Sequence, residues 1–259
     1  MRRLVLALLA TSVFGSVASA ADLPRKAAAT APDAIAAYDW TGWYFGAHLG
    51  GAWSRGDVSD SPLPNAAVAG QPFLPFDNDD ANVVGGIQGG YNWQFNRNWV
   101  AGIEADFSFT NLSGSQTYAP IPAFPAGFQA GTTETLSREI DWFGSVRGRL
   151  GYAWDRWLVY ATGGYAFAKI KTNAISIFPA NVYSFSDDSV KSGWTVGGGL
   201  EYGLAGNWTV RGEYLYYNFE DVSGVSFGVP STAPVGSSYL WENQIHTARI
   251  ALNYKPGWR

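Results

Sequence analysis

From residue 43 onward, apolar and polar residues alternate with a period of two, which is typical of β-strands that present two unlike faces. One face is built from aromatic, aliphatic and glycine residues, and it begins with Trp43, Phe45, Ala47 and Leu49. The same alternation recurs in eight stretches of the chain. We expect strands at residues 43–54, 82–95, 99–110, 140–154, 157–169, 193–204, 208–219 and 244–255.

The connections between these strands are short and long in turn. Three are turns of two or three residues, at 96–98, 155–156 and 205–207. Four are long and rich in Gly, Pro, Ser and Asp, near 55–81, 111–139, 170–192 and 220–243. An even strand number with this alternation of connections is typical of outer-membrane barrels. The pattern predicts an all-β fold, an eight-stranded antiparallel transmembrane outer-membrane β-barrel with short periplasmic turns and four long extracellular loops.

Alternation alone does not decide which face points outward, because a soluble lipocalin-like barrel has the same period with its apolar face inside. The positions of the aromatic residues favour the membrane barrel. Tryptophans gather at both ends of the apolar face, as in the two aromatic girdles of a membrane protein. The residues assigned to these girdles are Trp43, Trp53, Trp93, Trp99, Trp142, Trp154, Trp157, Trp194 and Trp208.

The N-terminus reads as an export signal. A charged start, a short apolar run and an Ala-x-Ala end predict a signal peptide over residues 1–20, cut between Ala20 and Ala21. Its apolar run is too short for a transmembrane helix. Residues 21–41, rich in Ala and Pro at first, are interpreted as a periplasmic linker, and 42–259 as the barrel domain.

Composition narrows the function classes. Charged residues make up only 15% of the chain, against about 25% in a typical soluble domain, and 47% of the residues are hydrophobic. The chain has no cysteine, which excludes thiol catalysis and Cys-ligated zinc. A net charge of −4 provides no basic surface for nucleic acid. We expect no cofactor and no metal.

The polar face carries balanced charges midway along the predicted strands. Glu201 and Arg211 lie equally far from Gly206 across a tight turn, so we expect them to be cross-strand partners. Three further pairs lie on neighbouring strands at similar numbers of residues from the strand ends beside the short turns. We therefore match Glu104 with Arg149, Asp106 with Arg147, and Glu213 with Arg249. The full set of predicted lumen charges is Glu104, Asp106, Arg147, Arg149, Glu201, Arg211, Glu213 and Arg249.

Two interpretations of these charges remain open. In the first, they pair to fill and seal an interior that eight strands make only wide enough for side chains. In the second, they form a charged constriction in a narrow channel. Lumen glycines, among them Gly86, Gly90, Gly102 and Gly199, support the second interpretation because we expect them to leave space unfilled.

Evidence for an enzyme is weak. By parity, His48 points into the lumen and His246 points out, so the two histidines do not share a site. We expect His48 to be hydrogen-bonded to a carboxylate or an amide, and no HExxH or Gly-x-Ser-x-Gly motif is present. The acidic runs 77–80 and 187–188 lack the spacing of a calcium loop and are interpreted as solvated loop charge.

Several motifs resemble a known family. These are Ala21-Asp22-Leu23-Pro24, the stretch 40–53 that begins Trp-Thr-Gly-Trp-Tyr-Phe-Gly, the glycine-rich stretch 85–94, and residues 249–255. On them the chain is similar to the small outer-membrane immunogenic (porin-family) barrel proteins of alphaproteobacteria. One departure is the tail 256–259, which follows the Tyr-Lys pair where such barrels usually end on an aromatic residue.

The resemblance implies an eight-stranded barrel with antigenic surface loops and a role in envelope integrity, without catalytic residues. The chain is therefore expected to be an integral outer-membrane protein with a structural and surface-antigen role. The alternative is a narrow porin that passes ions or small solutes through a Glu/Arg-lined lumen. Expected partners are outer-membrane lipid and lipopolysaccharide, the barrel-assembly machinery and a surface partner of the loops, with no nucleic acid.

Overall fold

The computed structural model describes residues 38–55, 58–62, 81–121, 132–177, 182–225, 227–229 and 237–257. The expected cleavage site at Ala20 and Ala21, the acidic run 77–80 and Trp258 lie outside these residues. Within the described part of the chain, no helix is long and apolar enough to cross a membrane.

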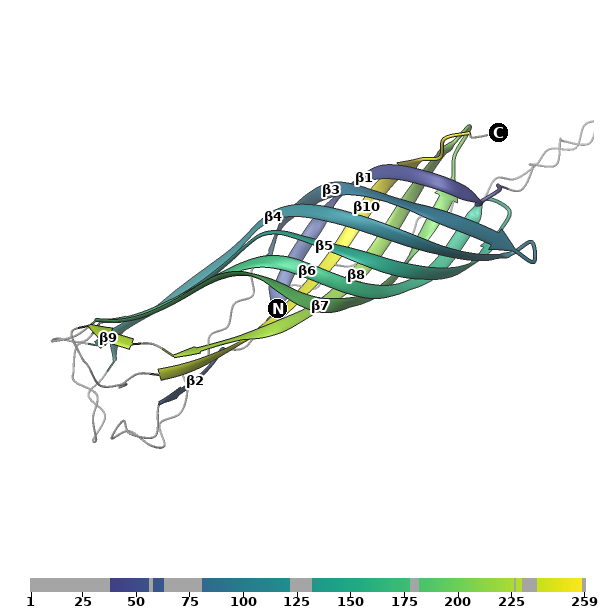
Figure 1. The fold of residues 1–259 in the computed structure, drawn as a ribbon. Coiled ribbons are helices and arrows are strands. Elements are labelled where there is room, and N and C mark those ends of the chain that lie inside the picture. The colour runs from purple at the N-terminus through teal and green to yellow at the C-terminus, as the bar shows by residue number, and fades with distance from the viewer. Residues whose placement is uncertain are drawn as a thin grey trace, which may run out of the picture. The chain divides into compact units, whose positions relative to one another are not determined.

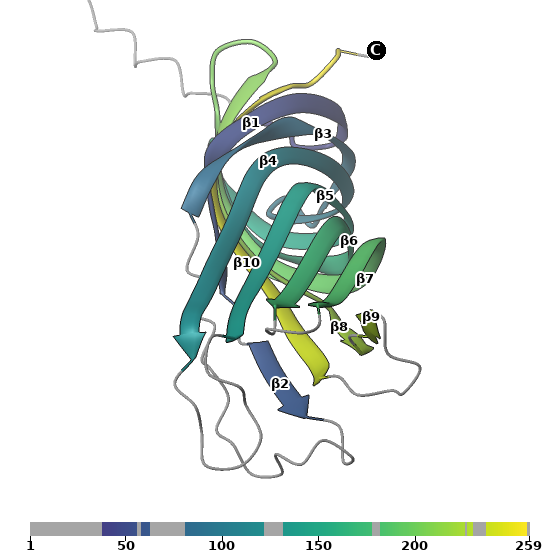
Figure 2. The same ribbon diagram turned by 90° about the vertical axis from the view of Figure 1, so that its left-hand side faces the viewer.

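Eight long antiparallel strands form a closed ring, which confirms the predicted fold class (Figures 1 and 2). In order around the ring they are β1 (Gly42–Arg55), β3 (Ala81–Phe95), β4 (Trp99–Ile121), β5 (Thr132–Trp154), β6 (Trp157–Ile177), β7 (Val182–Gly203), β8 (Trp208–Val225) and β10 (Ser237–Tyr254). Two short strands, β2 (Val58–Pro62) and β9 (Phe227–Val229), pair with β10 and β7.

The ring closes because the first strand pairs with the last. The register runs from Phe45 opposite Tyr254 to Arg55 opposite Gln244. At one end of the barrel, here called the turn end, the β3–β4 and β5–β6 turns contain Asn96 and Asp155 with positive φ angles of 47° and 52°. Asn and Asp tolerate this left-handed conformation better than other side chains, which suits them to tight turns. The opposite end, with the long connections, is called the loop end.

Strands at the loop end continue beyond the predicted ones, and β8 and β10 stay paired as far as Val225 and Ser238. β4 and β5 remain paired as far as Ile121 and Thr132, and β6 and β7 as far as Ile177 and Val182. Much of the predicted loops at 111–139 and 170–192 is therefore strand, because the hydrogen-bonded ladder continues after the apolar alternation stops. We call this sheet the β4–β7 extension, and it consists of residues 111–121, 132–141, 169–177 and 182–192.

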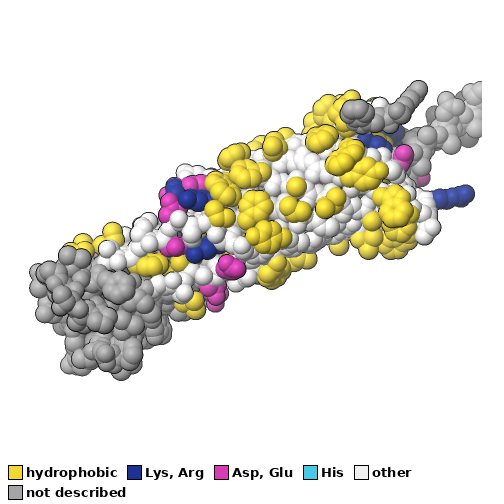
Figure 3. Space-filling model, viewed as in Figure 1, with side chains coloured by type: hydrophobic (Ala, Val, Ile, Leu, Met, Phe, Trp, Pro, Cys, Tyr) yellow, Lys and Arg dark blue, Asp and Glu magenta, His cyan; other side chains and the backbone are white. Residues whose placement is uncertain are grey.

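The apolar face of the barrel points outward, as the aromatic positions predicted. Leu49, Ile87, Ile103 and Ile250 are each more than half exposed on the outer surface. Figure 3 shows hydrophobic side chains spread over one face of the barrel wall. Alternate residues on the same strands are buried inside the ring. A face this apolar and this exposed matches the lipid-facing surface of a transmembrane barrel.

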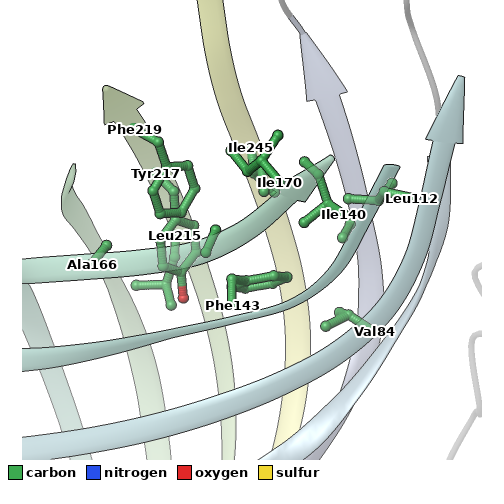
Figure 4. Close-up of a cluster of buried hydrophobic side chains, with 12 residues drawn as sticks. Val84, Leu112, Ile140, Phe143, Ala166, Ile170, Leu215, Tyr217, Phe219 and Ile245 are labelled. Atoms are coloured by element: carbon green, nitrogen blue, oxygen red, sulfur yellow. The ribbon is translucent and has the colours of Figure 1, made fainter. Parts of the chain in front are cut away.

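The interior is layered rather than uniformly polar. At the turn end, Trp40 packs with Val100, Ala153, Leu158 and Tyr160. A belt of charged side chains follows, and next to it, toward the loop end, lies an apolar layer, drawn in Figure 4. That layer consists of Ala52, Val84, Leu112, Ile140, Phe143, Ala166, Ala168, Ile170, Leu215, Tyr217, Phe219 and Ile245. The charge belt thus lies between two clusters of apolar side chains.

The last residues of the predicted linker belong to the barrel. Trp40 is buried, and its backbone N–H donates to Gln94 Oε1 at 2.8 Å. The Tyr38 N–H donates to the carbonyl of Asp155 at 2.9 Å, and its ring packs 4.7 Å from that of Trp40. Burial raises the pKa of the Tyr38 hydroxyl to about 12. These contacts fill the turn-end opening, so the packed domain begins before residue 42.

Candidate functional site

The charge belt spans the barrel interior and draws on strands all around the ring. Two acids come from β4, two arginines from β5, and the others from β7, β8 and β10. Between 1% and 5% of the surface of each residue is exposed. Its members are the eight predicted lumen charges, Glu104, Asp106, Arg147, Arg149, Glu201, Arg211, Glu213 and Arg249.

Glu104 is the centre of this belt. Its Oε1 accepts from Arg147, and its Oε2 lies 2.5 Å from Arg211 Nη1 and 3.6 Å from Arg149 Nη1. The Tyr44 hydroxyl also donates to Oε2. One carboxylate thus neutralises charge from three arginines on β5 and β8.

The remaining acids complete a continuous network. Asp106 lies 3.4 Å from Arg147 and 3.0 Å from Arg249. Glu213 bridges the same two arginines, at 3.2 Å from Arg147 and 2.6 Å from Arg249. Each of the eight charges of the belt therefore has an opposite charge in contact, which is the condition under which buried ions are tolerated.

Three of the predicted pairings are ion pairs in the structure, and the fourth is different. Glu104 contacts Arg149, Asp106 contacts Arg147 and Glu213 contacts Arg249. Glu201 and Arg211 are opposite each other in the β7–β8 register.

However, among the described residues, the carboxylate within ion-pair distance of Arg211 is Glu104, and Glu201 pairs with Arg149 at 2.9 Å. The prediction of a Glu201–Arg211 ion pair was wrong because a guanidinium group reaches across the lumen, beyond the neighbouring strand.

Neutral side chains add hydrogen bonds to the belt, and sequence reasoning did not single them out. The Tyr160 hydroxyl donates to Glu213 at 2.7 Å, and the Arg149 guanidinium stacks 4.3 Å from the centre of the Tyr160 ring. Asn253 donates to Glu201 at 2.9 Å. Tyr44 and Tyr160 have even residue numbers, whereas the outward aromatics of their own strands have odd numbers. This difference could have predicted that both tyrosines point into the lumen.

The lumen glycines do not leave open space. A Cβ atom built on Gly90 would lie 2.6 Å from the Tyr44 hydroxyl, and one on Gly199 would lie 2.6 Å from the Tyr160 hydroxyl. At Gly86 it would lie 2.8 Å from His48 Nε2. The expectation of unfilled volume was wrong, because each of these glycines makes room for a large polar side chain from a neighbouring strand.

Histidine 48 lies inside the barrel beside the belt. Its Nδ1 is 3.1 Å from Gln88 Oε1 and its Nε2 is 2.9 Å from Ser108 Oγ. The hydrogen bond to an amide is the kind that the sequence predicted. Although a histidine beside a serine resembles a nucleophile with its base, 4% or less of either residue is exposed, which leaves no room for a substrate.

The predicted girdle tryptophans form two groups on the outer surface. Near the turn end, Trp43, Trp99 and Trp208 pack against Tyr91, Tyr152 and Tyr254, with ring centroids 5.0–5.6 Å apart.

On the side of the loop end, Trp142 stacks on Phe107 at 5.2 Å. The Trp53 ring lies parallel to the outward His246 ring at 5.8 Å. The remaining girdle tryptophans are 39–60% exposed, and they are Trp93, Trp154 and Trp157 beside the short turns, and Trp194.

Comparison with known proteins reveals clear relatives. A family model described as the outer membrane protein beta-barrel domain matches residues 7–230. The chain is 36% identical to the 31 kDa outer-membrane immunogenic protein of Brucella melitensis, a match that covers 98% of this chain and 100% of that protein.

Two further similarities are weaker. The 22 kDa outer membrane protein of Rhizobium leguminosarum is 29% identical, over 70% of this chain and 65% of that protein. Among solved structures, the outer membrane protein OprG of Pseudomonas aeruginosa is 11% identical, with a TM-score of 0.48, and the match covers 83% of this chain and 98% of that one.

Proposed function

This chain belongs to the outer membrane β-barrel family, and from that membership we propose that it serves as a sealed, non-conducting barrel. Its work is to stabilise the envelope and to present the loop end as a surface antigen. The names of the curated relatives, which are outer-membrane immunogenic proteins, support this role.

In this proposal the loop end is extracellular, and the turn end and both termini are periplasmic. The three short turns lie at one end of the barrel, whereas strands at the other end extend beyond the ring before they connect. This contrast supports the orientation, because bacterial barrels carry short turns on the periplasmic side. The barrel-assembly machinery folds the protein, and outer-membrane lipid surrounds its apolar face.

The observation that carries the proposal is the closure of the lumen. Eight charges, at most 5% exposed, interlock at the centre, and an apolar layer lies against them toward the loop end. An ion entering from either end would have to break ion pairs held at low dielectric, which costs several kcal/mol per pair. This arrangement favours the structural role over the narrow porin that the sequence left open.

A non-enzymatic role follows from the same packing. The belt and His48 hold carboxylates, guanidinium groups and a hydroxyl close together, but their hydrogen bonds are made to one another. We propose that these groups stabilise the barrel and perform no chemistry.

Conductance in a planar bilayer tests the proposal. Mature protein, residues 21–259, is refolded, and heat-modifiable gel mobility identifies the folded fraction. We expect a silent bilayer from folded wild type. A known porin reconstituted in the same bilayer provides the positive control. Reproducible wild-type steps whose ion selectivity changes on substituting Arg147 or Arg149 would establish a porin instead.

A further inference from the structure

The outward face of the β4–β7 extension presents side chains in rows set by the strand register. One row runs across four strands in register as Ser115, Ser137, Asn173 and Ser186. Each of the four side chains is at least partly exposed, and Ser186 donates to Asn173 at 2.8 Å. We call this the hydroxyl row. The next row outward consists of Thr117, Thr135, Ile175 and Ser184, so it has three hydroxyl groups and one exposed apolar side chain.

The row toward the barrel is charged. It consists of Ser113, Glu139, Lys171 and Asp188 in register. Two neighbouring side chains join it. Lys169 lies 2.5 Å from Asp188, and Asp141, at the β-bulge of β5, lies 2.8 Å from Lys171. We call these residues together the charged row.

The charged row lies at the border of the apolar surface. Lys169 is opposite Trp142 in the β5–β6 register and two residues beyond Phe167, and both of those aromatics belong to the girdle on the side of the loop end. Figure 3 shows Lys and Arg side chains gathered with Asp and Glu at this border, beyond the hydrophobic wall. In a bilayer, aromatic girdles lie at the level of the headgroups.

We propose that the charged row and the hydroxyl row form a contact surface for the phosphorylated glycolipid of the outer leaflet. The Lys169 and Lys171 ammonium groups bind its phosphates, and the hydroxyl row meets its sugars. This inference rests on the proposed orientation, in which the loop end is extracellular.

The charge balance of the row fits a lipid layer cross-linked by divalent cations. Two lysines and three carboxylates give it a net charge of −1. An ammonium group has three donors, and the ion pair of Lys169 with Asp188 leaves donors for a phosphate. The carboxylates share hard divalent cations with neighbouring phosphates, because such cations prefer oxygen ligands.

Continuity with the lipid-facing wall selects this occupant over a second copy of the chain. The charged row adjoins the apolar surface without a break, so a lipid seated against Trp142 and Phe167 places its headgroup over Lys169. The ion pairs of this row are solvent-exposed and contribute little to stability, so substitutions here leave the barrel folded.

Binding of lipopolysaccharide and of its isolated lipid anchor tests the inference. Mature protein in phosphatidylcholine nanodiscs is titrated with each glycolipid in Mg²⁺ buffer. We expect Lys169→Gln/Lys171→Gln to bind about 30-fold more weakly, because each lysine near an anionic surface contributes to affinity. The control is Arg97→Gln, an exposed cation at the turn end, which should bind as wild type does.

Three results separate the outcomes. Enzymatic removal of the anchor's phosphates should weaken wild-type binding to the level of the double-lysine variant. Equal binding by the variant, or by dephosphorylated anchor, would overturn the inference. So would native mass spectra in which wild type is a dimer and the variant a monomer, since a second copy would then occupy this face.

Orientation is tested separately with Ser186→Cys and a membrane-impermeant maleimide on intact cells. Labelling is expected without permeabilisation. Labelling only after permeabilisation would overturn the proposed orientation, and with it the inference. Labelling of intact cells combined with lysine-independent glycolipid binding would overturn the inference alone.

Discussion

Replacement of Glu104 by Gln should destabilise the barrel more than any other single neutralisation in the charge belt. The substitution keeps the shape of the side chain and removes its charge. Arg211, Arg147 and Arg149 all contact this carboxylate, and within the described residues it is the ion-pair partner of Arg211. Arg211 is left buried without its counter-charge.

The magnitude follows from burial and distance. Removing one partner of a buried pair costs about 3–5 kcal/mol, and two charges in contact at an effective dielectric constant near 20 attract by about 4 kcal/mol. Glu104 retains Arg147 when Arg211 is replaced, so Arg211→Met should cost less than Glu104→Gln. In the double variant neither side chain is left uncompensated, so its cost should fall below the sum of the two single costs by about 2 kcal/mol.

Urea unfolding of the refolded barrel in lipid vesicles, followed by tryptophan fluorescence, provides the assay. A parallel double-mutant cycle on Glu201 and Arg211 is the matched control, because these residues are opposite in register without an ion pair between them. We expect the Glu104–Arg211 coupling to exceed the Glu201–Arg211 coupling by about 1 kcal/mol or more. Equal couplings, or a larger one for Glu201, would refute the cross-lumen pairing.

Three further predictions concern packing and titration. Gly90→Ala should destabilise the barrel by about 1–3 kcal/mol in the same urea assay, whereas Gly212→Ala, whose Cβ meets nothing within 4 Å, should be neutral or stabilising. Trp40→Ala should cost about 3–5 kcal/mol, and an unchanged unfolding midpoint would show that the turn-end packing is dispensable. The hydrogen bond with Lys171 lowers the pKa of Asp141 below its usual 3.8, so this ion pair persists above that pH and is lost as the pH falls through the lowered value. Carboxyl NMR should find the pKa restored in Lys171→Gln, and an identical pKa in both proteins would contradict the contact.

Local patterning was enough to predict the number of strands and the two faces of each. A period of two identifies the outward residues directly, so Trp43 and Leu49 could be placed on one face and His48 on the other. The predicted positions of Asp106 and Arg147 along their strands came within two residues of the true register. Arg147 lies opposite Glu104, and its long side chain reaches Asp106 as well.

Contacts across the lumen could not be predicted in this way. Because successive residues of a strand point to opposite faces, the sequence shows whether a side chain points into or out of the barrel. The distance between strands on opposite sides of the lumen depends on how the ring closes and how its strands are staggered. The Arg211–Glu104 pair spans β8 and β4, and no local spacing encodes it. The burial of Trp40 has the same origin, since the opening that it fills exists only when all eight strands are in place.

By itself, then, the sequence determined the strands, the direction of their faces and the position of the charges, because each depends on residues close together in the chain. Only the tertiary structure decided the partners of Arg211 and Glu201, the close contacts of Gly90 and Gly199, and the continuation of β4–β7 beyond the barrel. Each of these depends on atoms that come from distant strands. Closing the ring brings such atoms within a few ångströms of one another, and their packing rather than any motif fills the middle of the lumen.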